Sequence, residues 1–89
     1  MRVARHYLVS GRVQGVGFRF FAADAARDER VHGWVRNLPD GRVEIVAEGD
    51  ADAVERFERR VRRGPSAGQV DEVETADRPV SSVETFTIK

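Results

Sequence analysis

The chain has 89 residues, of which 40% are hydrophobic and 34% are charged, and its formal net charge is zero. These values are typical of one soluble globular domain spanning residues 1–89, and they provide no global field that would attract nucleic acid or an anionic membrane. The absence of cysteine excludes a disulfide framework and any cysteine-based metal or redox site.

The first predicted elements are a strand and a helix separated by a glycine-rich turn. Residues 3–10 are rich in β formers and carry apolar groups on both faces, which predicts an interior strand. Residues 18–29 are rich in alanine, and their apolar side chains recur at helical spacing. The members of this stripe are Phe18, Phe21, Ala22 and Ala25. The pattern predicts a helix that buries one side.

A β-hairpin is predicted over residues 31–49. Its first strand is short and rich in β formers, and the sequence Leu-Pro-Asp-Gly that follows is typical of a tight turn. In the second strand Val43, Ile45 and Ala47 alternate with polar residues, the period-2 pattern of a half-buried strand.

A second helix is predicted from Asp50 to the Gly64-Pro65 stop. Asp50 has the residue type of an N-cap, and Val54, Phe57 and Val61 form an apolar stripe. Four arginines crowd the last turns, where positive charge suits the helix dipole.

Residues 69–76 and 83–88 have the composition of two further strands. The element order is therefore β-α-β-β-α-β with a short extra strand at the end. This order is typical of the α+β ferredoxin-like sandwich, in which two helices cover one face of an antiparallel sheet.

The most informative stretch is residues 11–19, Gly-Arg-Val-Gln-Gly-Val-Gly-Phe-Arg. Its glycines permit a sharp turn between strand and helix, and the helix N-terminus presents unpaired amides and a partial positive charge. Arg19 in the first turn adds a fork of donors that suits phosphate or carboxylate. The stretch predicts an anion site.

The predicted topology brings a second residue, from the hairpin, to this site. The strand of residues 3–10 and the first strand of the hairpin run in the same direction, so both end at one rim of the sheet. Asn37 lies at the end of the hairpin strand. We therefore expect Asn37 and Arg19 to face each other across the glycine-rich loop.

Both segments closely resemble the signatures of the acylphosphatase family. Residues 11–19 resemble its first signature, and Gly33-Trp-Val-Arg-Asn-Leu-Pro-Asp-Gly-Arg-Val43, continuing to Gly49, resembles its second. The resemblance covers the whole chain, and the family's fold is the ferredoxin-like sandwich. It implies hydrolysis of acyl phosphates, which are carboxylic-phosphoric mixed anhydrides, to carboxylate and inorganic phosphate, without a metal or other cofactor.

The resemblance also implies a role for each residue of the site. Arg19 corresponds to the family's phosphate-binding arginine and Asn37 to its water-orienting asparagine. The loop whose amides hold the phosphoryl oxygens corresponds to Gln14, Gly15, Val16, Gly17 and Phe18. Some family members carry a hydroxyl residue next to the asparagine, where this chain has Leu38. That departure concerns auxiliary contacts only.

Two other functions are open to this fold. A non-catalytic module that binds an anion or metabolite would also use a glycine-rich loop. Ferredoxin-like domains that bind RNA stack bases on aromatic residues of the central strands. Residues 42–48 contain no aromatic residue and two acids, so RNA binding is disfavoured. His6 and His32 are isolated and lack the spacing of metal ligands.

The remaining expectations concern partners and location. Small acyl phosphates are the expected substrates, with phosphate or sulfate as product or inhibitor, and no nucleic acid or membrane is expected as a partner. No apolar run is long enough to span a bilayer, and no signal peptide is apparent. We therefore expect a cytoplasmic monomer.

Overall fold

The computed structural model describes all residues, 1–89, and contains two helices and five strands. In chain order the elements are β1 (Arg2–Arg12), α1 (Phe18–Glu29), β2 (His32–Asn37), β3 (Val43–Asp50), α2 (Ala51–Arg63), β4 (Gln69–Arg78) and β5 (Phe86–Ile88). Neither helix is long and apolar enough to cross a membrane.

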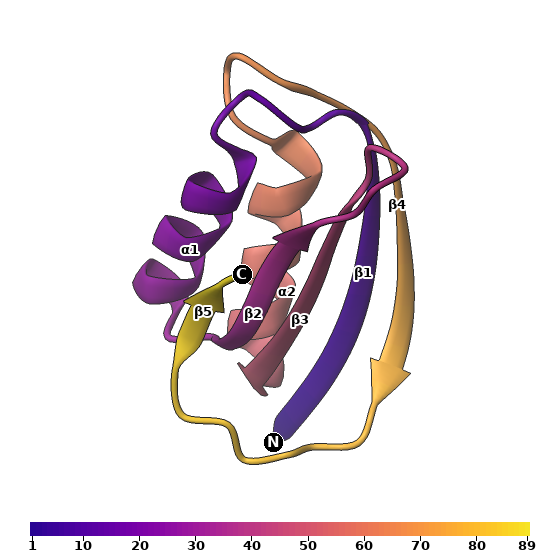
Figure 1. Ribbon diagram of the computed structural model, residues 1–89. Helices are drawn as coiled ribbons and strands as arrows, with labels where there is room; N and C mark the ends of the chain where they lie inside the picture. Colours follow the sequence, from indigo (N-terminus) through magenta and orange to yellow (C-terminus); the bar gives the residue numbers. More distant parts are fainter.

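The five strands form one sheet in the order β4-β1-β3-β2-β5. All neighbours are antiparallel except β2 and β5, which are parallel. Both helices cover the same face of this sheet (Figure 1). The predicted ferredoxin-like α+β sandwich with an extra C-terminal strand is therefore confirmed.

The register of the sheet places the ends of β1 and β2 at one rim. Both strands run antiparallel to β3, and Val43 of β3 pairs with Val9 on one side and with Asn37 on the other. The glycine-rich loop leaves β1 at this rim and leads into α1 (Figure 1). The sheet therefore brings the loop and Asn37 together, as the predicted topology requires.

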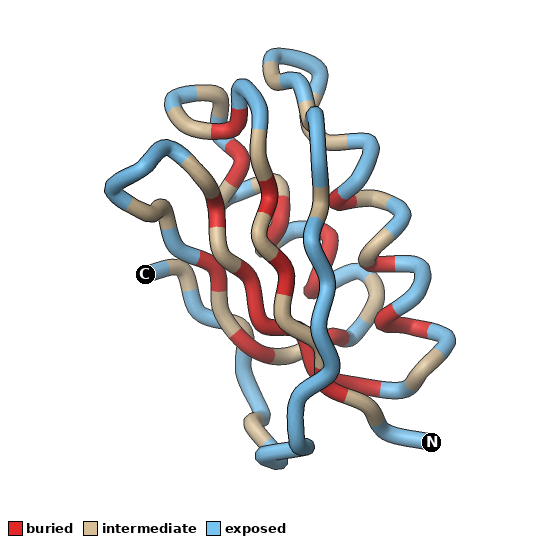
Figure 2. Tube along the Cα trace, turned by 90° about the vertical axis from the view of Figure 1, so that its right-hand side faces the viewer, coloured by how far each residue is buried: buried red, intermediate tan, exposed pale blue.

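The hydrophobic core lies between the sheet and the helices. In Figure 2 the buried residues follow the inner strands and the sheet-facing sides of the helices, whereas β4 is exposed along most of its length. The core includes Tyr7, Val9, Phe18, Ala22, Ala25, Val35, Val43, Ile45, Ala47, Val54, Phe57 and Val61. The alternating residues of β3 and the apolar stripes of both helices thus supply the core.

The start of α2 differs from its prediction. Asp50 occupies the N-cap position, but its side chain makes no capping hydrogen bond. Its Oδ1 atom instead accepts a hydrogen bond from the N-terminal amine of Met1 at 3.2 Å. The paired ends of β1 and β3 bring that amine within reach, because Arg2 pairs with Asp50.

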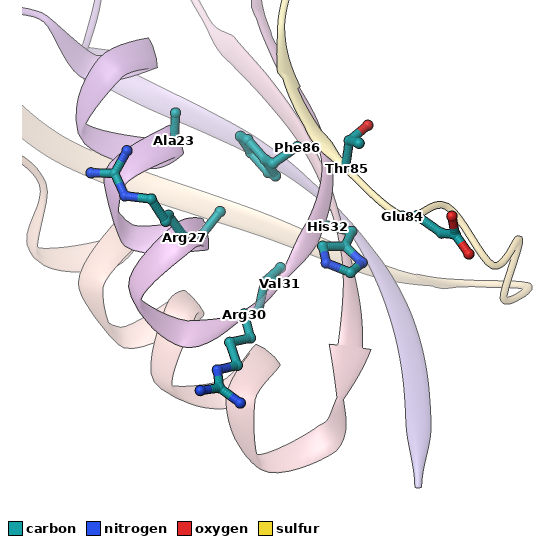
Figure 3. Close-up of a pocket in the computed structure, with 9 residues that line it drawn as sticks. Ala23, Arg27, Arg30, Val31, His32, Glu84, Thr85 and Phe86 are labelled. Carbon is teal, nitrogen blue, oxygen red and sulfur yellow. The ribbon is translucent and has the colours of Figure 1, made fainter.

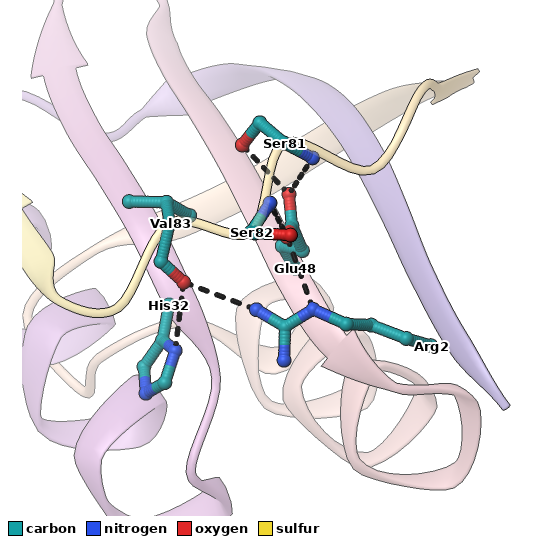
Figure 4. Close-up of polar contacts among 6 residues, drawn as sticks. All are labelled: Arg2, His32, Glu48, Ser81, Ser82 and Val83. Atoms are coloured by element: carbon teal, nitrogen blue, oxygen red, sulfur yellow. Dashed lines mark hydrogen bonds and ion pairs between the residues drawn. The ribbon is translucent and has the colours of Figure 1, made fainter.

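The connector between β4 and β5, residues 79–85, is fastened to a buried carboxylate (Figure 4). The Glu48 side chain is only 1% exposed and accepts hydrogen bonds from the amides of Ser81 and Ser82, the Ser81 hydroxyl and the Arg2 guanidinium, at 2.6–3.1 Å. Burial by itself disfavours the charge, but the bonds from Ser81, Arg2 and Ser82 outweigh it and lower the pKa of Glu48 to about 2.

A second anchor of the connector lies at Val83. Its carbonyl oxygen accepts hydrogen bonds from Arg2 at 3.0 Å and is 3.1 Å from Nδ1 of His32. The connector therefore crosses the end of the sheet in a defined path and delivers β5 to the edge of β2. We predicted this last strand over residues 83–88, but ladder pairing begins only at Phe86, and the Val83 carbonyl bonds to side chains instead of to a neighbouring strand.

Candidate active site

The loop between β1 and α1 adopts the conformation that its glycines permit. Gly15 and Gly17 have φ angles of 74° and 77°, in the left-handed region that favours glycine. Gly17 is also the N-cap of α1, so the helix start has no side-chain cap, and the first turn contains no acidic residue. The positive end of the helix dipole is therefore left without a protein anion.

The backbone amides of this stretch are available as donors. Between residues 14 and 20 no amide donates a hydrogen bond to another protein group, and the first that does is Phe21, which donates to the Gly17 carbonyl at 2.9 Å. Unpaired amides at a helix N-terminus form an anion-binding site in many proteins. The loop thus offers a row of unpaired donors at the start of α1.

The side chain of Gln14 ties the loop to the β2–β3 turn. Its Nε2 atom donates to the carbonyl oxygens of Leu38 at 2.8 Å and of Arg42 at 3.0 Å. Leu38 follows Asn37 directly, so this amide fixes the distance between the loop and the end of β2.

Asn37 supplies an acceptor at the same site. Its Oδ1 atom is buried and accepts no hydrogen bond from any protein group. A buried carbonyl oxygen without a donor is costly, and in native structures such an atom usually has a water or ligand as its partner.

Arg19 is held by the C-terminus of the chain. Its Nη1 atom donates to the backbone oxygen of Lys89 at 3.1 Å, and no side-chain carboxylate pairs with it. Lys89 is in turn held by its amide, which donates to the Val35 carbonyl at 2.9 Å. The remaining guanidinium donors are free to bind an anion.

These groups surround a hollow of about 120 Å³. It is lined by Val13, Gly15, Gly17, Phe18, Arg19, Phe20 and Asn37. The predicted residues Gly15, Gly17, Phe18, Arg19 and Asn37 are thus brought together. Gln14 and Val16 do not line the hollow: Gln14 turns to the β2–β3 turn, and Val16 packs against the core.

Two residues of the site were not anticipated from the sequence. Lys89 is 70 positions from Arg19, and no local pattern connects them. Phe20 did carry a signal, because it is an apolar residue off the buried stripe of α1, on a side that helical spacing assigns to solvent.

A larger cavity of about 570 Å³ lies elsewhere, between the end of α1 and residues 84–86 (Figure 3). Ala23, Val31 and Phe86 contribute apolar wall, and Arg27 at its edge pairs with Asp24 on the helix surface at 2.8 Å. None of the predicted site residues lines it.

The chain also contains no cluster of three or more histidine, aspartate or glutamate side chains that would hold a metal ion.

The sequence model of the family described as Acylphosphatase matches residues 5–88. An acylphosphatase of Methanospirillum hungatei is 51% identical over 85 residues, covering 92% of this chain and 91% of that protein. An acylphosphatase of Pseudomonas aeruginosa is 43% identical over 88 residues, covering 99% and 97%. The crystal structure of acylphosphatase from Bacillus subtilis has a TM-score of 0.95 at 38% identity, over 98% of each chain.

Proposed function

The chain belongs to the acylphosphatase family, and we propose that the amides of residues 14–18, Arg19 and Asn37 carry out the family's reaction in it. The enzyme hydrolyses acyl phosphates to a carboxylate and inorganic phosphate. Phosphoryl transfer of this kind depends on positioning and on stabilising negative charge more than on covalent chemistry.

The amides and Arg19 hold the phosphoryl group. Its non-bridging oxygens accept hydrogen bonds from the loop amides and from the free donors of the Arg19 guanidinium. Donors that are fixed before the reaction stabilise charge in the transition state without reorganising. The left-handed glycines at Gly15 and Gly17 and the bond from Arg19 to Lys89 support this arrangement, because they hold the donors in place.

Asn37 orients the attacking water. Its Oδ1 atom accepts a hydrogen bond from an O–H of the water and places the water oxygen in line with the bond that breaks. A new bond forms between water oxygen and phosphorus, while the bond from phosphorus to the acyl oxygen breaks and its electron pair leaves with the carboxylate. The proton of the water remains with the phosphate product. A carboxylate is a good leaving group, so no strong general acid is needed.

The buried, unpartnered Oδ1 of Asn37 is the observation that carries this proposal. A module that only binds an anion would surround it with donors, because an acceptor oxygen repels a phosphate oxygen. An acceptor beside a cradle of donors instead suits the O–H of a water molecule. The same atom therefore disfavours the alternative of a non-catalytic anion-binding or metabolite-binding module.

The test is phosphate release from benzoyl phosphate in the presence of EDTA. Losing a preorganised donor costs about 10²–10³ in rate, so we expect a loss of this size for Arg19→Ala. We also expect Arg19→Ala to weaken competitive inhibition by phosphate or sulfate. Asn37→Ala should lower kcat and leave that inhibition nearly intact, because Asn37 binds the water and not the phosphate.

Arg63→Ala is the matched control, since Arg63 is an exposed arginine of α2 that does not line the hollow. It should behave as wild type. Full activity in both Arg19→Ala and Asn37→Ala would refute the catalytic roles assigned to these two residues. No turnover by wild type, together with tight phosphate binding, would favour the non-catalytic module.

The same proposal describes a monomer that acts in the cytoplasm. Only three large apolar side chains are exposed, Met1, Phe20 and Val80, which is little for a stable dimer interface. The edge strand β4 carries several charges, which oppose pairing between sheets. Sedimentation should give the mass of one 10.0 kDa chain, and cell fractionation should recover the activity with cytosolic markers. A dimer mass or recovery with membranes would contradict these two points.

A further inference from the structure

Phe20 is an exposed aromatic side chain beside the proposed catalytic residues. It is 63% exposed, whereas its neighbour Phe18 is 2% exposed and anchors the start of α1 in the core. Phe20 follows Arg19 directly and lines the same hollow as Arg19 and Asn37. An apolar ring exposed to water at this position contributes nothing to the core, and its place in the lining of the hollow leaves it free to contact a bound molecule.

The size of the hollow decides which part of the substrate it holds. Its volume of about 120 Å³ is well below the roughly 300–1,000 Å³ of pockets that enclose a drug-sized ligand. A hollow of this size suits a phosphoryl group with the attacking water, but it does not enclose an organic acyl group as well. The acyl group must therefore leave through the mouth of the hollow and lie on its rim.

Phe20 is the apolar surface available at that rim. Of the three large apolar side chains that are exposed in this chain, only Phe20 lines the hollow. The other two apolar side chains of the lining, Val13 and Phe18, are buried and form its inner wall. An acyl group that emerges from the hollow has one apolar partner, and this partner is aromatic.

We propose that Phe20 binds the acyl group of the substrate and makes the enzyme prefer acyl phosphates with an aromatic or bulky apolar acyl part over small ones such as acetyl phosphate. This inference rests on the proposed function, because it needs the phosphoryl group at Arg19. Phe20 touches a part of the substrate that does not react, so it binds substrate and transition state about equally. The preference is therefore expressed in KM and not in kcat.

The experiment compares benzoyl phosphate with acetyl phosphate in wild type, Phe20→Ala and Phe20→Tyr. The contact between the Phe20 ring and the benzoyl ring is lost in Phe20→Ala, whereas acetyl phosphate has no ring to lose a contact. The ratio of kcat/KM for benzoyl over acetyl phosphate should therefore fall about tenfold. The change should lie in the KM for benzoyl phosphate. Phe20→Tyr keeps the ring and should keep the ratio. Val80→Ala, which shortens another exposed apolar side chain away from the hollow, should also keep it.

Two results would overturn the inference and can be told apart. If wild type hydrolyses both substrates and Phe20→Ala leaves their ratio and both KM values as in wild type, the acyl contact is refuted while the proposed function stands. If wild type hydrolyses neither substrate, the proposed function fails, and this inference fails with it. Circular dichroism of Phe20→Ala, which removes an exposed side chain only, checks that the variant is folded.

Discussion

At the scale of single residues, Gln14 is the side chain that joins the two sides of the site. Its two hydrogen bonds to the β2–β3 turn hold the loop of amide donors at a fixed distance from Asn37. The sequence places Gln14 in the loop, and the family resemblance assigns it a backbone donor. The bracing role of its side chain follows only from the folded chain, because its partners lie 24 and 28 positions away.

Replacing Gln14 by alanine should therefore impair catalysis without removing any group that binds phosphate. Small displacements of catalytic groups cost up to about 10²-fold in rate, and we expect Gln14→Ala to lower kcat/KM by tenfold to about 10²-fold. Steady-state kinetics with benzoyl phosphate measures the loss. Gln14→Glu should be at least as impaired, because a carboxylate would face two carbonyl oxygens.

The matched control is Gln69→Ala. Gln69 is exposed, and its side-chain amide donates a hydrogen bond only to Asp71, at 3.1 Å. Wild-type kinetics in Gln14→Ala, or an equal loss in Gln69→Ala, would show that the brace does not matter for catalysis.

Arg19 and Asn37 were both predicted as site residues, and the structure places them around one hollow. Their proximity could be predicted from the sequence, because each residue lies at the end of a predicted element on the same rim of the sheet. Their catalytic roles stay predictions. The sequence could not predict that the Oδ1 atom of Asn37 is buried without a hydrogen-bond partner, because its burial depends on neighbours from several elements.

At the scale of elements, helix and strand boundaries followed local signals closely. α1 was predicted over 18–29 and is observed at Phe18–Glu29, because a glycine-rich loop precedes it and alanine fills it. The hairpin of β2 and β3 also appears as predicted. Gly33 in β2 is needed there for contact: a Cβ atom would lie 1.9 Å from the Val46 carbonyl oxygen.

The elements after α2 were predicted less well. β4 extends to Arg78, beyond the predicted end at residue 76, and β5 is shorter than predicted. Both differences come from the connector of residues 79–85. Its path depends on Glu48, which is 33 positions before Ser81 and appears in the sequence as one more polar residue of an alternating strand.

At the scale of the whole molecule, Glu48 couples stability to pH. Its folded-state pKa is lowered to about 2 from the ordinary value of 4.5, so the folded state favours the ionised carboxylate. This contribution to stability is complete above pH 4.5 and is lost as the pH falls toward 2. A lowering of this size corresponds to about 3 kcal/mol of unfolding free energy.

Urea unfolding between pH 7 and pH 2 measures this effect. Wild type should lose stability steeply below pH 4.5, and Glu48→Gln, less stable at pH 7, should show a shallower dependence over the same range. Some dependence should remain, because hydrogen bonds from His6 and Arg36 outweigh burial and lower the pKa of Glu44 as well. Glu84→Gln alters an exposed carboxylate of the connector and should follow wild type. Parallel curves for wild type and Glu48→Gln would refute the role of Glu48.

The order of elements, the two-layer fold and the glycine-rich loop between β1 and α1 were determined by the sequence alone. Their signals are local: glycine at left-handed turns, alternation along strands and apolar stripes along helices. The tertiary structure alone decided the rest. The burial of Glu48, the contact of Lys89 with Arg19 and the exposure of Phe20 at the mouth of the hollow depend on groups that only packing brings together. Residues 70 positions apart, such as Arg19 and Lys89, leave no periodic pattern by which their contact could be predicted.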